Sequence, residues 1–74
     1  MKLTDCKIGD NVKILEVKAG KGAISNLARL GLSIGNVIKI IRNSFLYGPV
    51  LVFYRETEIA IGHKLAGKIM VQKN

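Results

Sequence analysis

The side chains that most often perform nucleophilic or acid–base chemistry are scarce in this chain of 74 residues. It has one histidine, His63, and one cysteine, Cys6. The two could act as base and nucleophile if the fold brought them together. Cys6, however, stands at an apolar position of the pattern between Leu3 and Ile8, which favours a buried core thiol. The sequence therefore predicts no catalytic residue and a protein that is not an enzyme.

Ligands for a metal ion or a phosphate group are also few. A structural zinc site needs four Cys or His ligands at paired spacing, and this chain has two such residues in total. The segment Gly20-Lys21-Gly22 lacks the P-loop spacing and the Ser or Thr after the lysine, so it predicts an ordinary loop. We expect no cofactor and at most weak binding of iron or zinc by one chain. A weak or inter-chain metal site stays open.

The remaining candidates for function are apolar residues in two predicted loops. Loops are usually polar, so clustered apolar side chains there indicate either core or a docking surface. The candidate partner-binding set is Leu30, Gly31, Leu32, Gly35, Phe45, Leu46, Tyr47, Gly48 and Pro49. Leu32, Leu46 and Tyr47 are its leading anchors. The alternative is that these side chains plug the ends of a barrel.

A short helix and two glycines position the first of these loops. The segment ISNLARL at 24–30 has the apolar spacing of a helix, and Ser25 could cap its start. Gly31 then lies just past the helix, where the chain usually adopts a left-handed conformation that only glycine adopts cheaply. We expect Leu32 to fold back on the helix. Gly35 predicts a second turn, into the next strand.

Five short segments rich in Ile and Val predict strands. They are 12–18, 36–42, 50–55, 58–61 and 69–72. The first changes phase after Ile14, which suggests a β-bulge or a bend. A tight turn at Glu56-Thr57 joins the third strand to the fourth, and one helical turn fits between 63 and 69. The prediction is a mostly β fold, a small barrel of about five strands with one short inserted helix, because closure leaves few free strand edges.

The bulk composition indicates one domain, residues 1–74, with 49% apolar residues to build its core. A single cysteine cannot form an internal disulfide, which favours a reducing compartment. The longest apolar run, 45–54, is too short to span a bilayer as a helix, and we see no signal peptide. We therefore expect a soluble, cytoplasmic protein.

The formal net charge of +7 has two interpretations. It could be a solvated surface that keeps the protein soluble. It could also attract something anionic, such as nucleic acid, an acidic protein face or the inner leaflet of a membrane. Charge alone does not decide between them.

An ordered set of short motifs resembles the FeoA family, the small cytoplasmic partners of the ferrous iron transporter FeoB. The set begins with L-x-x-x-K-x-G-D at Leu3 and KGAI at 21–24. It continues with L-x-x-L-G-L-x-x-G from Leu27, L-x-G-P from Leu46 and I-A-I at 59–61. Each motif is weak, but together they span nearly the whole chain in the right order.

The resemblance implies an SH3-like barrel without enzymatic activity, which supports ferrous iron uptake through contact with cytoplasmic parts of FeoB. It also implies an association with transition metals, contact with a membrane only through the transporter, and at most a weak homo-oligomer. Three positions depart from the family pattern: Phe45 replaces a frequent proline, Glu56 a glycine and Gly62 an arginine. No role that depends on that arginine is carried over.

Nucleic-acid binding is the alternative function. The segment KIGDNVKILEVKAGKG at 7–22 is similar to a KOW segment of translation proteins, and small basic barrels bind RNA. Aromatic residues make up only 5% of the chain, so stacking platforms for bases are scarce. The helix expected at 24–30 also fits the FeoA family better. An RNA-binding module is therefore the less favoured interpretation.

Overall fold

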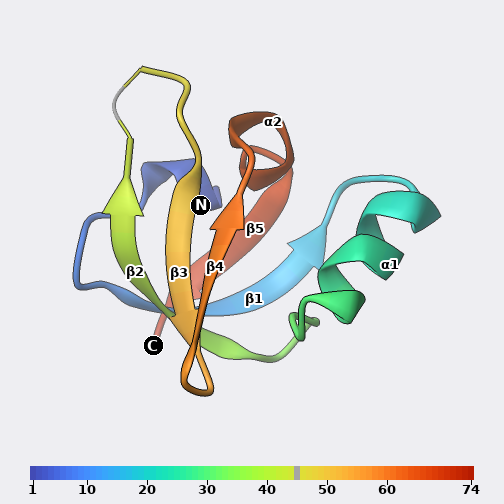
Figure 1. Cartoon of the computed structure of the whole chain (residues 1–74), viewed down its shortest axis with the longest axis horizontal. Coiled ribbons are helices and arrows are strands. Elements are labelled where there is room, and N and C mark those ends of the chain that lie inside the picture. Colours follow the sequence, from blue (N-terminus) through green and yellow to red (C-terminus); the bar gives the residue numbers. More distant parts are fainter. Residues whose placement is uncertain (45) are drawn as a thin grey trace.

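The computed structural model describes residues 1–44 and 46–74, which form five strands and three short helices (Figure 1). In chain order they are a 3-10 helix η1 (Leu3–Asp5), β1 (Asn11–Val17), α1 (Lys21–Arg29), β2 (Val37–Asn43), β3 (Val50–Tyr54), β4 (Thr57–Ile61), α2 (His63–Ala66) and β5 (Ile69–Lys73). The predicted mostly β fold is confirmed. Within the described residues, no helix is long and apolar enough to cross a membrane.

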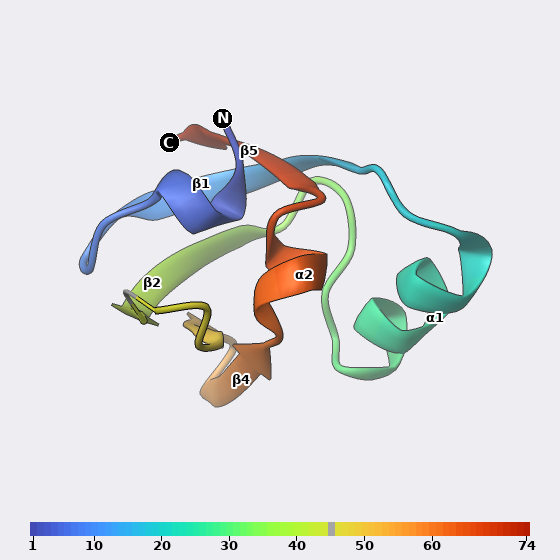
Figure 2. The same ribbon diagram turned by 90° about the horizontal axis from the view of Figure 1, so that it is seen from above.

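The strands form one antiparallel sheet in the order β4-β3-β2-β1-β5. The sheet curls, but β4 and β5 are its two ends and no ladder joins them in the part of the chain that the structure describes. The short helix α2 lies between these ends (Figures 1 and 2). "Barrel" is therefore a loose description of a curled, open sheet.

The irregularity predicted in the first strand, a β-bulge or a bend, is confirmed as a shift in register. The register of β1 against β5 shifts between Ile14 and Glu16, and Leu15 turns outward with 43% of its surface exposed. β1 pairs with β2 through Lys13, and its remaining residues run along β5. The C-terminal end of β1 therefore pairs with β5 but with no strand on the side where α1 lies (Figures 1 and 2).

The core is apolar, and each strand contributes two residues to it at alternate positions. Its buried members are Leu3, Cys6, Val12, Ile14, Leu27, Leu32, Ile38, Ile40, Val50, Val52, Ile59, Ile61, Ala66, Ile69 and Val71. Among the described residues none that is polar or charged is buried. The alternation follows from the period of two in a strand, which turns every second side chain to the same face. The expected burial of Cys6 is confirmed.

The turn between β3 and β4 lies one residue earlier than predicted. Arg55 and Glu56 form it, with φ values of 48° and 64°, both positive as the favoured two-residue hairpin turn requires. This turn pairs Val50 with Ile61 across the two strands. A turn at 56–57 would move Val50 opposite a residue beyond the end of β4 and lose that apolar pair.

α1 begins at Lys21, three residues before the predicted start. The carbonyl of Gly20 accepts hydrogen bonds from the N–H groups of Ala23 and Ile24 at 3.1 and 3.2 Å. The loop expected at Gly20–Gly22 is therefore the beginning of the helix. The low helix propensity of Gly22 conceals this start, and Ser25 lies inside the helix and does not cap it.

The predicted end of α1 is confirmed at Gly31, whose φ is 94°. Its N–H bonds to the carbonyl of Ala28 at 3.0 Å, and the next N–H, from Leu32, bonds to the carbonyl of Leu27 at 2.8 Å. This bond pair is the Schellman motif, which reverses the chain and turns the following apolar side chain back onto the helix. Gly35, also with a φ of 94°, forms the second predicted turn.

Candidate partner-binding surfaces

The structure places the candidate residues at opposite ends of β2. Those from Leu30 to Gly35 precede β2, and those from Leu46 to Pro49 follow it (Figure 1). A strand of seven residues is about 20 Å long. The two loops therefore do not combine into one compact patch. Phe45 lies outside the described residues.

Leu32 is part of the core, with 1% of its surface exposed. The Schellman bonds at the end of α1 turn its side chain inward, as the sequence predicts. This removes Leu32 as an exposed anchor for a partner. For Leu32, the alternative interpretation, that the side chain fills the interior of the fold, is therefore correct.

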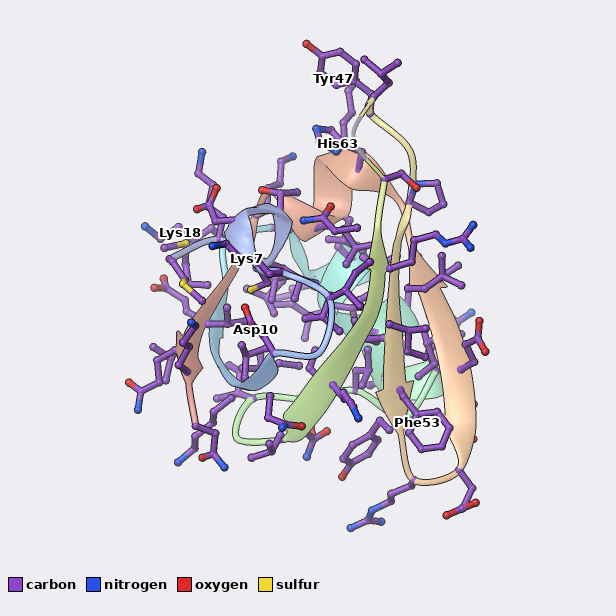
Figure 3. All side chains as sticks on the ribbon, turned by 90° about the vertical axis from the view of Figure 1, so that its left-hand side faces the viewer. Lys7, Asp10, Lys18, Tyr47, Phe53 and His63 are labelled. Carbon is purple, nitrogen blue, oxygen red and sulfur yellow. The ribbon has the colours of Figure 1, made fainter. Side chains whose placement is uncertain are left out.

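Leu46 and Tyr47 are the two most exposed large apolar side chains among those the structure describes, at 79% and 81%. Together with Gly48 and Pro49 they form what we call the β2–β3 tip. Tyr47 has a φ of 58°, in the left-handed region. Its ring meets the ring of His63, the first residue of α2, edge to face with centroids 5.1 Å apart (Figure 3). The tip thus projects from the sheet but rests on α2.

Gly48 holds the base of the tip closed. A Cβ at this position would lie 2.5 Å from the Cβ of Ser44 and 2.8 Å from its Oγ. Only glycine permits this close approach of the two sides of the loop. The glycine of the L-x-G-P motif is therefore required here for the close packing of Gly48 against Ser44.

The chemistry of Cys6 is that of an inert thiol. Its Sγ donates to the carbonyl of Lys2 at 3.7 Å, and 3% of the residue is exposed. Burial, with smaller contributions from Asp10 and Asp5, raises the pKa of Cys6 to about 11. A nucleophilic cysteine needs a lowered pKa, so the environment of Cys6 opposes nucleophilic chemistry.

An apolar groove, the α1 groove, runs between α1 and the free end of β1. Its lining is Ile14, Val17, Ile24, Leu27, Ala28, Leu32, Ser33 and Ile34, and its volume is about 270 Å³. Ile24 and Ile34 expose 44% and 61% of their surface at its walls. Sequence reasoning did not include Ile24, Ala28 or Ile34 among the site residues. The helical stripe of Ile24 and Ala28, followed by an apolar Ile34 in a turn, was the signal for them.

Charge is distributed unevenly along the chain. No Asp or Glu occurs between Val17 and Arg55, whereas lysines and arginines recur throughout that stretch. The β2–β3 tip lies within this stretch, and so does the α1 groove apart from Ile14. The five carboxylates are Asp5, Asp10, Glu16, Glu56 and Glu58. The chain between Val17 and Arg55 is therefore basic.

The outer face of the sheet carries Phe53, 40% exposed and visible in Figure 3, as a candidate stacking platform. It pairs across the strands with Lys39 on one side and with Glu58 on the other. With Ile8 and Lys39, Phe53 borders a hollow of about 450 Å³. A carboxylate beside a lone aromatic ring repels phosphate, so this face is poorly suited to nucleic acid.

The comparison with protein families decides the assignment. The FeoA domain model matches residues 1–73. This chain belongs to the FeoA domain family. A curated protein of Methanocaldococcus jannaschii named "Putative Fe(2+) transport protein A" is 41% identical to this FeoA domain over 70 residues, which cover 95% of the chain and 83% of the relative. The resemblance found in the motifs is confirmed.

Solved structures with the same fold include other FeoA proteins. A crystal structure of an iron uptake regulatory protein (FeoA) matches with a TM-score of 0.85 at 28% identity, over 100% of this chain and 96% of the other. The solution structure of FeoA from Chlorobium tepidum matches with a TM-score of 0.87 at 29% identity, over 99% and 70%. A manganese-dependent transcriptional repressor also matches, with a TM-score of 0.90, over 100% of this chain and 41% of its own. At 19% identity, that likeness shows the fold alone.

Proposed function

We propose that this protein is a non-enzymatic accessory protein of ferrous iron uptake, which docks on the cytoplasmic part of a FeoB-type iron transporter. Membership of the FeoA family and the name of its relative, an Fe(2+) transport protein A, support the role in iron uptake. The raised pKa of the buried Cys6 thiol supports a role without catalysis. On this proposal the protein meets a membrane only through the transporter.

The observation that carries the docking proposal is the exposure of the β2–β3 tip. Leu46 and Tyr47 each present about four-fifths of their surface to solvent and contribute nothing to the core. An aromatic and a branched aliphatic side chain in one compact site commonly carry interface energy, at roughly 2 kcal/mol or more each. The contact of Tyr47 with His63 limits the freedom of the ring before a partner arrives, which lowers the entropy lost on binding.

The net charge of +7 supports an acidic contact face on the transporter. Arg42 stands close to the start of the tip along the chain, and Lys64 follows the histidine on which the tip rests; both are exposed. Such charges at the rim of an interface mainly speed association. The apolar tip would then determine how long the complex lasts.

Two variants of the tip test this proposal against a matched control. We would measure binding of the purified protein to the detergent-solubilised FeoB-type transporter of the same organism. Leu46→Asp and Tyr47→Asp should bind at least about tenfold more weakly, because each places a charge in a buried apolar contact. The control is Ile8→Asp, which introduces the same charge at a side chain that is 69% exposed but lies outside the tip.

Thermal unfolding of each variant shows whether a loss of binding reflects a loss of fold. Unchanged folding with weaker binding in the tip variants, and normal binding by Ile8→Asp, supports docking through the tip. Wild-type binding by both tip variants, or an equal loss in the control, refutes it. Salt-dependent binding of generic RNA without binding of the transporter would favour the nucleic-acid alternative.

A further inference from the structure

We propose that the α1 groove is a separate binding site, which takes an acidic segment of another protein through a leucine-sized apolar side chain. The groove lies before β2 and the β2–β3 tip after it, so the two surfaces are distinct. The inference therefore does not depend on the proposed contact between the tip and a transporter.

The groove is open because α1 is attached to the core through one buried side chain. Leu27 is 3% exposed and is the only buried residue of the helix. Ile24 and Ala28, which stand four residues apart and so share one face of α1, line the groove and do not belong to the core. An apolar cavity of about 150 Å³ holds a molecule of benzene. The 270 Å³ of the groove is therefore enough for one large aliphatic side chain.

The groove offers an incoming ligand almost no polar partner. Ser33 is the one polar residue of its lining. The N–H of Ser33 donates to Oδ1 of Asn36 at 2.8 Å, and its hydroxyl lies 3.3 Å from the same atom. These groups are already satisfied within the turn. An apolar side chain is therefore the part of a ligand that fits, since a buried polar group would lack a partner.

The charges around the groove determine the rest of the ligand. The segment 14–36, which supplies the whole lining, contains three cations, Lys18, Lys21 and Arg29, and one carboxylate, Glu16, which leaves a net charge of +2. Acidic residues flanking the apolar anchor would meet these cations. A second copy of this chain, with its own charge of +7, would be repelled. A nucleic acid would find no aromatic ring in the lining on which to stack its bases.

Titration with synthetic peptides, followed by amide chemical shifts of the 15N-labelled protein, tests the proposal. One probe is a short amphipathic peptide of leucine and glutamate. The second carries lysine in place of glutamate, and the third carries serine in place of leucine. The glutamate–leucine peptide should bind at least about tenfold more tightly than either control, because only it has both the anchor and the complementary charge. Its shifts should be confined to α1, the end of β1 and residues 31–36.

Variants then connect the binding to the groove itself. Ile34→Asp places a charge at a wall residue that is 61% exposed, and it should weaken the glutamate–leucine peptide about tenfold. Ala28→Glu, on the exposed surface of α1, provides the same test if the first variant does not fold. Leu46→Asp, at the tip, is the matched control and should bind the peptide as the wild type does.

Three results would overturn the proposal: no measurable binding of the glutamate–leucine peptide, equal binding of its lysine counterpart, or shifts that cluster at the β2–β3 tip. Normal binding by a folded Ile34→Asp would do the same. Because these measurements use no transporter, failure of the α1 groove and failure of transporter docking are separate results.

Discussion

Replacement of Gly31 by alanine tests how the chain is turned between the helix and the sheet. The residue has a φ of 94°, and an added Cβ would meet no atom within 4 Å. The cost of Gly31→Ala is therefore conformational and not steric. The left-handed conformation costs an ordinary residue roughly 1–2 kcal/mol. Alanine also lowers the conformational entropy of the unfolded chain, which offsets about 0.4–1 kcal/mol of this cost. We expect a net loss of about 1 kcal/mol in the free energy of unfolding.

Gly22→Ala is the matched control for this change. Gly22 lies inside α1, has no positive φ, and its Cβ would also meet no atom within 4 Å. Here alanine improves helix propensity and restricts the unfolded chain, so we expect a gain of about 0.5 kcal/mol. The same chemical change should thus have opposite signs at two positions that differ in backbone conformation.

Urea denaturation followed by far-UV circular dichroism measures both variants. For a domain of this size, a loss of 1 kcal/mol corresponds to a fall in Tm of about 4–8 °C. If Gly31→Ala is as stable as the wild type, the Schellman motif does not hold the chain as argued. If both variants shift in the same direction, backbone conformation at Gly31 is not the cause.

Two further predictions concern the N-terminal part of the core. The pKa of Cys6 is raised to about 11 from an ordinary value of 9.0, so the thiol favours folding up to about pH 9 and this contribution is lost as the pH rises to about 11. Over that range the wild type should lose roughly 2 kcal/mol more stability than Cys6→Ala, and parallel pH profiles of the two would contradict the assignment. Nδ2 of Asn43 donates to the carbonyls of Thr4 and Cys6, each at 2.8 Å. Asn43→Ala should therefore cost about 1–3 kcal/mol by urea denaturation. The exposed Asn26→Ala should change stability by less than about 0.5 kcal/mol, and an equal effect of the two would refute this role for Asn43.

Local patterns in the sequence were sufficient where a structural feature depends on neighbouring residues. The alternation of Ile38 and Ile40 predicts which face of β2 is buried, because side chains in a strand point alternately to opposite faces. The phase change after Ile14 predicts the register shift in β1, and a glycine after an amphipathic segment predicts the end of α1 at Gly31.

Local patterns failed where the alternative conformations differ little in free energy. The start of α1 was missed because Gly22 has a low helix propensity, although the helix begins before it at Lys21. The turn at Arg55 and Glu56 was placed one residue late because no glycine or asparagine marks the two positions of positive φ. The pairing of Val50 with Ile61 compensates for this strain, and that pairing is a contact between strands which the turn sequence does not encode.

Only the tertiary structure decided which apolar loop residues are available to a partner. Leu32 and Leu46 are the same residue type, each in a loop and next to a glycine or one residue away from it. The Schellman bonds direct Leu32 into the core, whereas Leu46 lies in a loop that projects from the sheet and stays exposed. The α1 groove likewise exists because β1 separates beyond Ile14 from the segment that leads into β2. Local residue patterns determine the elements and their buried faces, but the burial of a loop side chain depends on which distant segment packs over it.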